Sequence, residues 1–513
     1  APRIFSTALK AGGLFICDYS QFFPDRYDDP RWEAPEYILV WGNNPVVANS
    51  DGTLGHWVVE SMKRGSKLIV MDPMLTWLAG KADVWFQLRP GTDAALALAL
   101  CDQIIKDDLY DHEFVSCWCY GFDEFAEHVR QYPVSFAAET CGVPEDLIVE
   151  AARKIGRAKS CCLQWGVAMD HTSEGFITGM ACFDLMALTG NFEKPGTMVA
   201  ANPVWDMSVT WMPREKVWEG CSEPVKDQGR TMNFKYPALK AMAAISPDML
   251  LEAMETGVPY PPQMMWVHGT NPIANMGGDA PRIYRAWQNV PYTVVVDYYL
   301  TPTAVAFADL VLPVAMSVER DSFRSWWQPL RTMTAAAGRY YECMMDEELV
   351  FYLGKRFNPD FFNQFETVRD FLTWMIQDDG NGVPYTFEDL THTVYDYWDW
   401  NETYHKYEKG LLRFDGEPGF NTITGQIEAY SILYESWGED PLPYYEEPRF
   451  SKRSRPEWTD EYPLDFITGA RRPTSFHTEH RMAQTMREFH PEPRVKVSPK
   501  TAAEYDLHDG DWI

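Results

Sequence analysis

The feature that most restricts the possible folds of this chain is an internal repeat. Residues 40–49, VWGNNPVVAN, resemble residues 267–275, VHGTNPIAN, and each segment follows an apolar run typical of a β strand. Downstream, KLIVMDP matches YTVVVDY, with strands ending at Asp72 and Asp297, and ADV matches ADL. Matched positions lie 225 to 227 residues apart. We therefore predict a duplicated domain, because the repeats of solenoid proteins are much shorter.

The segments between the paired motifs have helical patterns. HWVVESMKRG precedes KLIVMDP, and PRIYRAWQNV precedes YTVVVDY. A strand, a turn, a helix and a second strand in this order form a βαβ unit, whose strands are parallel. We therefore predict an α/β protein with two related Rossmann-like domains built on parallel sheets.

The last part of the chain changes character. Residues 463–513 contain short apolar runs separated by turn residues, as in RVKVSP and DLHDGDWI, which predict the start of a β-rich, barrel-like cap domain. We place the domains at residues 1–198, 199–445 and 446–513. Because both ends interrupt expected elements, we expect the chain to be a piece of a longer protein.

The formal net charge of −29 argues against a nucleic-acid partner, since phosphate binding requires a dense cationic surface. The ten cysteines include no CxxC pair, so we expect reduced, mostly buried thiols and no zinc or iron–sulfur site in this chain. The chain lacks the run of about 18 apolar residues that predicts a membrane span. Because no secretory signal pattern opens the chain, a cytoplasmic location and export of the folded protein (Tat) in an anaerobic bacterium both stay open.

Glycine turns and aspartates mark two candidate ligand sites. Open α/β sheets bind ligands at the carboxyl ends of their strands, where an acidic residue after the second strand commonly accepts hydrogen bonds from a ribose. Asp72 and Asp297 occupy such positions, and Gly42 and Gly269 lie at the preceding turns. A turn or helix-cap role is the alternative for either aspartate. Neither turn has the GxGxxG pattern, which disfavours an NAD-dependent dehydrogenase.

Two further segments concentrate polar side chains. In LRPGTD, Arg89 can pair with a phosphate and Asp93 with the N1–H and amino group of guanine; a surface turn with a helix cap is the alternative. The run TGARRPTSFHTEHRM at 468–482 contains arginines suited to phosphate and histidines suited to proton transfer, with a solvated loop as the alternative. Its basic residues are Arg471, Arg472, His477, His480 and Arg481.

Together these segments resemble the molybdopterin oxidoreductases of the dimethyl sulfoxide reductase family over nearly the whole chain. The resemblance is carried, in the family's order, by VWGNNP, KLIVMDP, LRPGTDAALALAL, LTGNFEKPG, VHGTNP, VVVDYYLTPTAVAFADLVLPVA, TGARRPTSFHTEHR and RVKVSPKTAAEYDLHDGDW. It implies two molybdopterin guanine dinucleotides around one molybdenum or tungsten, with each α/β copy holding the guanosine diphosphate end of one of them.

The resemblance also implies a set of site residues. One cofactor would be bound by Gly42, Asn44, Asp72, Arg89, Gly91 and Asp93. The other would be bound by Gly269, Asn271, Asp297 and Thr303. The funnel shared by both would be lined by Trp165, Gly166, Arg471, Ser475, His477 and Arg481. Of these, Trp165 and His477 are the predicted catalytic residues.

The protein ligand of the metal is expected before the first Gly–x–Asn–Pro turn. Cys17, in LFICDYS, is our choice because a thiolate is a good soft ligand. Asp18 and Ser6 are alternatives, and Cys17 can instead be a buried core thiol. We expect the family's N-terminal lobe with its [4Fe-4S] cluster, and the end of its C-terminal lobe, to lie outside this chain. An iron–sulfur electron-transfer subunit is the expected protein partner.

The segments SFHTEHR and GDW are most similar to the branch of acetylene hydratase, pyrogallol transhydroxylase and the catechol dehydroxylases. The resemblance thus implies oxidoreductase or hydroxyl-transfer chemistry, such as dehydroxylation, on a small, catechol-like substrate. A hydratase-like lyase and a non-catalytic scaffold subunit of the same fold are the alternatives.

Overall fold

The computed structural model describes residues 10, 15–17, 32–48, 53–170, 172, 175–200, 246–324, 331–377, 385–392, 404–413, 415–469, 472, 474 and 483–513. The chain divides into two compact units, formed by residues 1–200 with 403–513 and by residues 201–402. The predicted domain boundaries stay predictions. The contacts nevertheless assign residues 403–445, which we expected in the second domain, to the first unit.

A four-stranded parallel sheet organises the first unit, with the strand order β4-β3-β2-β6. Its strands are β2 (Tyr37–Trp41), β3 (Lys67–Met71), β4 (Val84–Phe86) and β6 (Cys161–Trp165). Val40 of β2 pairs with Val70 of β3 and with Gln164 of β6. All five residues of β2 are buried, as expected for a parallel strand with both faces covered.

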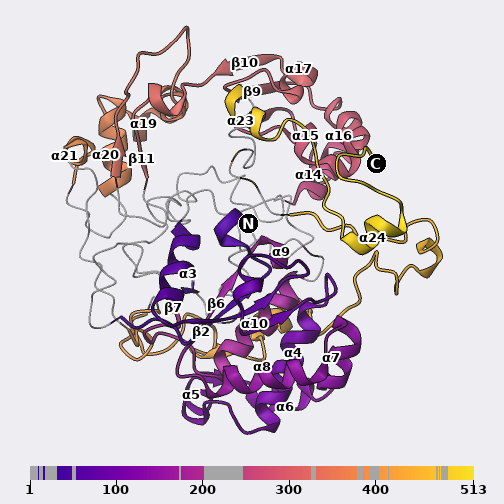
Figure 1. Ribbon diagram of the computed structural model, residues 1–513. Helices are drawn as coiled ribbons and strands as arrows, with labels where there is room; N and C mark the ends of the chain where they lie inside the picture. The colour runs from indigo at the N-terminus through magenta and orange to yellow at the C-terminus, as the bar shows by residue number, and fades with distance from the viewer. Residues whose placement is uncertain are drawn as a thin grey trace. The chain divides into compact units, whose positions relative to one another are not determined.

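Helices cover this sheet. They are α2 (Pro45–Ala48), α3 (Thr53–Lys63), α4 (Asp93–Lys106), α5 (His112–Trp118), α6 (Phe122–Val129), α7 (Val134–Cys141), α8 (Glu145–Arg157), α9 (Val167–Asp170) and α10 (Gly175–Leu188). The central helix is α4, whose run from Ala94 to Asp102 is buried. It packs against α7, α8 and α10, and these helices form one layer of the unit (Figure 1). The burial of α4 on all sides explains why its sequence, AALALALC, lacks a polar face.

A three-stranded parallel sheet with the order β10-β9-β8 organises the second unit. Its strands are β8 (Met265–His268), β9 (Thr293–Asp297) and β10 (Leu310–Pro313). The helices of this unit are α14 (Pro247–Thr256), α15 (Pro272–Asn275), α16 (Ala280–Trp287), α17 (Pro302–Phe307), α18 (Asp346–Phe357), α19 (Pro359–Phe362), α20 (Val368–Gln377) and α21 (Phe387–Thr391). Val267, Val295, Ile283 and Trp287 form a core between the sheet and α16.

The two sheets confirm the predicted duplication. β2, β3 and β4 have the same order and direction as β8, β9 and β10. Val40 pairs with Val70 in the first copy, and Val267 pairs with Val295 in the second, which are the positions that the sequence repeat aligns. The predicted α/β fold class with parallel sheets is therefore correct.

The expectation of a β-rich lobe differs from what the described residues show. After residue 446 these residues contain a 3₁₀ helix at Pro456–Trp458 and the helices α23 (Gln484–Phe489) and α24 (Pro499–Glu504), and no strand. The run RVKVSP forms no strand, and its last residue, Pro499, begins α24. Alternating apolar residues form a stable strand only when a neighbouring strand takes up their backbone hydrogen bonds.

Residues 404–413 and 415–455 belong to the first unit. In β13 (Ile427–Glu428), Ile427 pairs in parallel with Cys119 of β5 (Cys119–Tyr120). Lys406 forms a buried ion pair with Glu193, with 2.9 Å between Nζ and Oε2. Helix α22 (Ile432–Trp437) follows. Two small antiparallel pairs complete the described strands: β1 (Phe15–Cys17) with β7 (Met198–Ala200), and β11 (Ser322–Arg324) with β12 (Arg331–Met333).

The expected thiols and the expected lack of a membrane span can be compared with the described residues. Nine cysteines there are free, and six of them are buried, which agrees with reduced core thiols. Across the same residues, no helix combines the length and the apolar character needed to cross a bilayer.

Candidate functional site

The two Gly–x–Asn–Pro turns have the same backbone geometry. Gly42 and Gly269 follow β2 and β8 with φ angles of +56° and +58°, which favour glycine. The Gly42 N–H donates to the Met71 carbonyl at 3.1 Å, and the Gly269 N–H donates to the Val296 carbonyl at 2.9 Å. Each turn leads into a four-residue helix, α2 or α15. Each turn is thus held at the carboxyl edge of its sheet.

The aspartates after β3 and β9 are also equivalent. Asp72 Oδ1 accepts a hydrogen bond from the Met74 N–H at 2.8 Å, and Asp297 Oδ1 accepts one from the Tyr299 N–H at 3.1 Å. Both side chains therefore close the same turn over their own backbone, and the second oxygen of each carboxylate stays available to a ligand. Burial raises the pKa of Asp72, and the Met74 hydrogen bond offsets part of that rise.

A further matched pair involves the residue before each glycine. The indole N–H of Trp41 donates to Asp93 Oδ1 at 2.8 Å, and His268 Nε2 lies 2.5 Å from Asp346 Oδ1. Asp93 and Asp346 are the first residues of α4 and α18. The sequence predicts Asp93 but not Asp346. Asp346 is 78 residues from His268, whereas Asp93 is 52 residues from Trp41, so the offset of the repeat does not identify it.

The asparagines of the two turns differ. Asn271 Oδ1 accepts hydrogen bonds from Thr303, at 2.7 Å from Oγ1 and 3.3 Å from the backbone N–H. The Oδ1 atom of Asn44 is buried and has no hydrogen-bond partner among the described residues. Thr303 itself is fully buried, so it supports the turn from inside. An unpaired buried carbonyl oxygen is costly, which makes Asn44 suited to accept a hydrogen bond from a ligand.

The ends of β2 and β6 approach each other closely. A Cβ atom on Gly166 would lie 2.5 Å from the Gly42 carbonyl oxygen, so no other residue fits without a backbone shift. The Asn43 side-chain amide donates to the Trp165 carbonyl at 3.0 Å. This contact brings the predicted catalytic residue Trp165 beside the first turn. Trp165 is half-buried.

Cys17, the predicted metal ligand, lies near the same edge. It is 1% exposed, and its Sγ donates a hydrogen bond to the Leu163 carbonyl of β6 at 3.2 Å. These contacts are those of a buried core thiol, the alternative given above. The described residues include no cluster of three or more His, Cys, Asp or Glu side chains able to hold a metal. The role of Cys17 as a ligand stays a prediction.

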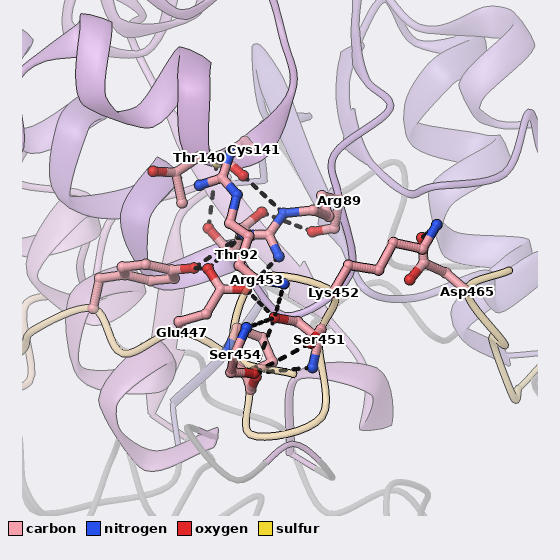
Figure 2. A network of polar contacts seen from close by, with 12 residues as sticks. Arg89, Thr92, Thr140, Cys141, Glu447, Ser451, Lys452, Arg453, Ser454 and Asp465 are labelled. Carbon is pink, nitrogen blue, oxygen red and sulfur yellow. Dashed lines mark hydrogen bonds and ion pairs between the residues drawn. The ribbon is translucent and has the colours of Figure 1, made fainter. Parts of the chain in front are cut away.

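Arg89 is bound to a carboxylate. Its guanidinium contacts both oxygens of Glu447, with distances of 2.5 and 2.8 Å (Figure 2). The φ angle of the nearby Gly91 is +79°, and a Cβ atom there would lie 2.5 Å from Pro448 Cγ. The predicted phosphate contact of Arg89 stays a prediction, and these contacts disfavour it.

The remaining predicted residues cannot be placed. Arg471, Ser475, His477 and Arg481 lie outside the described residues. Arg472, from the same basic cluster, is described, and its Nη1 lies 3.0 Å from the ring nitrogens of His490. The structure therefore brings together a turn and a helix-starting aspartate within each unit, and it places Trp165 beside the turn of the first unit.

Known proteins share this architecture. A family model described as molybdopterin oxidoreductase matches residues 2–326. Acetylene hydratase of Syntrophotalea acetylenica is 28% identical over 481 residues, which cover 88% of this chain and 63% of that protein. Dopamine dehydroxylase of Eggerthella lenta is 26% identical over 480 residues, covering 76% of this chain and 45% of that protein. The chain thus spans about half to two thirds of these relatives' lengths.

A solved structure supports the same assignment. Acetylene hydratase from Pelobacter acetylenicus matches with a TM-score of 0.80 and 25% sequence identity, covering 99% of this chain and 69% of that one. The family model extends over more than half of the chain and includes both Gly–x–Asn–Pro turns. The chain therefore belongs to the molybdopterin oxidoreductase family, which implies a molybdenum- or tungsten-pterin cofactor.

Proposed function

We propose that this chain is the cofactor-binding core of a molybdenum or tungsten enzyme and that its two units hold one molybdopterin guanine dinucleotide each. The observation that carries the proposal is the repeated pair of a ring N–H and a helix-starting aspartate, Trp41 with Asp93 and His268 with Asp346. Two equivalent acidic positions at two equivalent strand ends suit two identical nucleotide ends.

The described residues of the first copy fit a guanosine diphosphate end. Guanine presents N1–H and an amino group side by side, and a carboxylate accepts from both. Trp41 orients Asp93 through one oxygen, so the other oxygen can face a base. Asp72 offers a carboxylate oxygen to the ribose hydroxyls, and Asn44 offers its unpaired amide oxygen. Positive φ at Gly42 shapes the turn that carries Asn44, and a Cβ atom there would lie 3.1 Å from Met169 Cγ.

The second copy fits less directly. Asp346 is shared between His268 and Arg320, because the Arg320 guanidinium also contacts its Oδ2. Asn271 is bonded to Thr303 and has no free acceptor of the kind that Asn44 offers. In this unit Asp297 is thus the residue best placed to accept from a ribose, while Asp346 is the candidate for the base.

The metal–pterin group, when bound, supplies a centre that exchanges oxygen or hydroxyl with a substrate and passes electrons in pairs. The protein's part is to orient and exclude water. The bond from Asn43 to the Trp165 carbonyl and the close approach of Gly166 to Gly42 hold the backbone of Trp165 beside the first turn. We propose that Cys17 ligates the metal as a thiolate, giving up its hydrogen bond to Leu163.

The cofactor proposal is tested on the full-length enzyme purified anaerobically. We expect two guanosine monophosphates per molybdenum or tungsten atom after acid hydrolysis. Asp93→Asn and Asp346→Asn should each lower nucleotide content, whereas Asp107→Asn and Asp321→Asn, which remove surface ion pairs in the two units, should not. Wild-type enzyme that contains metal and pterin but one nucleotide or none would contradict the proposal. Cys17→Ser should lower metal content.

For the reaction, we propose dehydroxylation of a small catechol-like substrate, supported by the similarity to dopamine dehydroxylase. Replacing an aryl hydroxyl by hydrogen consumes two electrons and two protons and releases water, so it requires an electron donor. The greater coverage of acetylene hydratase favours a second candidate, hydration. Adding water to a triple bond consumes no electrons.

The electron requirement separates the two reactions. Full-length enzyme is incubated anaerobically with a catechol panel or with acetylene, with and without a reduced viologen dye. Catechol loss coupled to dye oxidation supports dehydroxylation. Acetaldehyde formation from acetylene, sustained without consumption of dye, supports hydration and overturns dehydroxylation.

A further inference from the structure

The segment Tyr445–Ser454, here called the strap, covers the turn at residues 89–92 within the first unit (Figure 2). Four of the five guanidinium N–H groups of Arg89 are engaged. Glu447 accepts two, the Thr140 carbonyl accepts the Nε–H at 3.0 Å, and the Tyr445 hydroxyl accepts one at 3.1 Å. The side chains of Arg89 and Glu447 are each 24% exposed.

The strap is itself rigidly folded. Ser451 Oγ donates to Glu447 Oε1 at 2.5 Å, and Ser454 Oγ donates to the Pro448 carbonyl at 2.5 Å. Arg453 donates to the Glu139 carbonyl of α7 at 2.8 Å. This bond attaches the strap to the unit at a second place, besides Arg89. Glu447 is therefore held in place before Arg89 contacts it, and the bidentate geometry costs little further ordering.

The turn beneath the strap connects Arg89 to Asp93. The Thr92 hydroxyl donates to the Arg89 carbonyl at 2.7 Å, and the Arg89 N–H donates to the Cys141 carbonyl at 2.8 Å. Gly91 lies against Pro448 of the strap, and α4 begins two residues after Gly91, at Asp93. The strap and the start of α4 that presents the Asp93 carboxylate are thus joined through this one turn.

The pair is charged over the whole physiological pH range. Burial opposes ionisation of Glu447, but hydrogen bonds from Arg89, Ser451 and Tyr445 outweigh it and lower the pKa to about 2. The same hydrogen bonding raises the pKa of Arg89. A phosphate that bound Arg89 would have to displace a fully ionised, bidentate carboxylate, and the single guanidinium N–H left over is a poor anion site.

We propose that Arg89 and Glu447 are positioning residues for cofactor binding: the pair locks the strap on the turn and thereby orients Asp93, and Arg89 contacts no phosphate. This inference rests on the proposed role of Asp93 in binding the guanine end. It replaces the phosphate role that the sequence suggests for Arg89, and it gives the strap, distant in sequence, a part in the nucleotide site.

The test is a double-mutant cycle in the full-length enzyme, comparing wild type, Arg89→Gln, Glu447→Gln and the double variant. The readout is the rate at which guanine nucleotide and metal leave the protein in buffer, independent of turnover. We expect each single variant to accelerate release about tenfold and the double variant to release no faster than either single one, because both changes break one contact. Tyr445→Phe should accelerate release less, about two- to threefold.

The control is Arg153→Gln, which removes a comparable arginine–carboxylate pair with Asp107 on the surface of the same unit, at 2.6 Å. It should leave release unchanged, and thermal unfolding of the cofactor-free variants shows which of them fold. If Arg89→Gln accelerates release while Glu447→Gln leaves it unchanged or slows it, Arg89 is a phosphate ligand and the inference is overturned. Wild-type enzyme without guanine nucleotide would instead overturn the proposed function.

Discussion

The two copies of the repeat share a backbone but differ in what surrounds it. In the first copy, β6 lies beside β2, Gly166 presses on Gly42, and the strap covers the turn before α4. In the second, a Cβ atom on Gly269 would meet no described atom within 4 Å. Conversely, Asn271 is bonded to Thr303, whereas Asn44 has an unpaired oxygen.

This difference indicates how a duplicated fold can specialise. The backbone hydrogen bonds and the aspartates that we propose to place a nucleotide are present in both copies. The first copy is packed tightly and leaves the asparagine oxygen of its turn unpaired, while the second pairs its asparagine oxygen with Thr303. The predictions below test whether tight packing and ligand dependence belong to the first copy alone.

The largest expected effect concerns the close approach of the two strand ends. In Gly166→Ala the new Cβ would lie 2.5 Å from the Gly42 carbonyl oxygen, so backbone must move, and we expect a loss of about 3 kcal/mol in the free energy of unfolding. In Gly269→Ala only the positive φ is unfavourable, so we expect the free energy of unfolding to fall by about 1–2 kcal/mol. Hydrogen exchange measured separately in the two sheets reports both values. Equal losses would show that packing at the turns is alike.

The second prediction concerns the core beneath the first copy. Asp184 of α10 is buried, which raises its pKa from 3.8 to about 7, against the opposing effect of Lys10, whose Nζ lies 3.1 Å away. Because the folded pKa lies above the unfolded one, the contribution to stability is full below about pH 4 and is lost as the pH rises towards 7. The slope should reach at most about 1.4 kcal/mol per pH unit.

The pH effect should be local to the first unit. We expect opening free energies from hydrogen exchange in α4, which packs on α10, to fall as the pH rises from 5 to 7, and those in α16 to stay level. Asp184→Asn, which cannot ionise, should flatten the dependence in α4. A slope that persists in this variant would exclude Asp184 as its source.

Much of this organisation is predictable from sequence because its signals are local. Apolar runs, Gly–x–Asn–Pro turns and the aspartates after the second strands identify the duplication and the family, and Gly42 and Gly269 adopt the positive φ that such turns require. The partners of the site are not predictable in this way. Asp346 is 78 residues from His268, and Glu447 is 358 residues from Arg89. No spacing rule connects such pairs, since only the packing of distant segments brings them together.

The third prediction separates the two asparagines. Asn271→Ala removes an acceptor from Thr303 and should lower the free energy of unfolding of the cofactor-free protein by about 1–2 kcal/mol. Asn44→Ala removes no protein hydrogen bond from Oδ1, so the cofactor-free protein should unfold nearly as wild type does. The loaded protein should then lose cofactor faster in Asn44→Ala. Equal destabilisation of both cofactor-free variants would mean that Asn44 has a protein partner.

The smallest effect tests what the copies share. Thr76 Oγ1 accepts a hydrogen bond from the Ala79 N–H, and Thr301 Oγ1 accepts one from the Ala304 N–H, each at 3.1 Å. The two threonines lie four residues after Asp72 and Asp297, respectively. Valine keeps the size of threonine but has no hydroxyl. Thr76→Val and Thr301→Val should therefore each lower the free energy of unfolding by about 1 kcal/mol, the usual net contribution of one hydrogen bond. Chemical denaturation of the cofactor-free protein, with local hydrogen exchange to assign the loss, measures both. A loss of stability in Thr301→Val alone would mean that the hydroxyl matters only where it caps α17. The turn after Asp72 would then be held by its surroundings, in line with the tighter packing of the first copy.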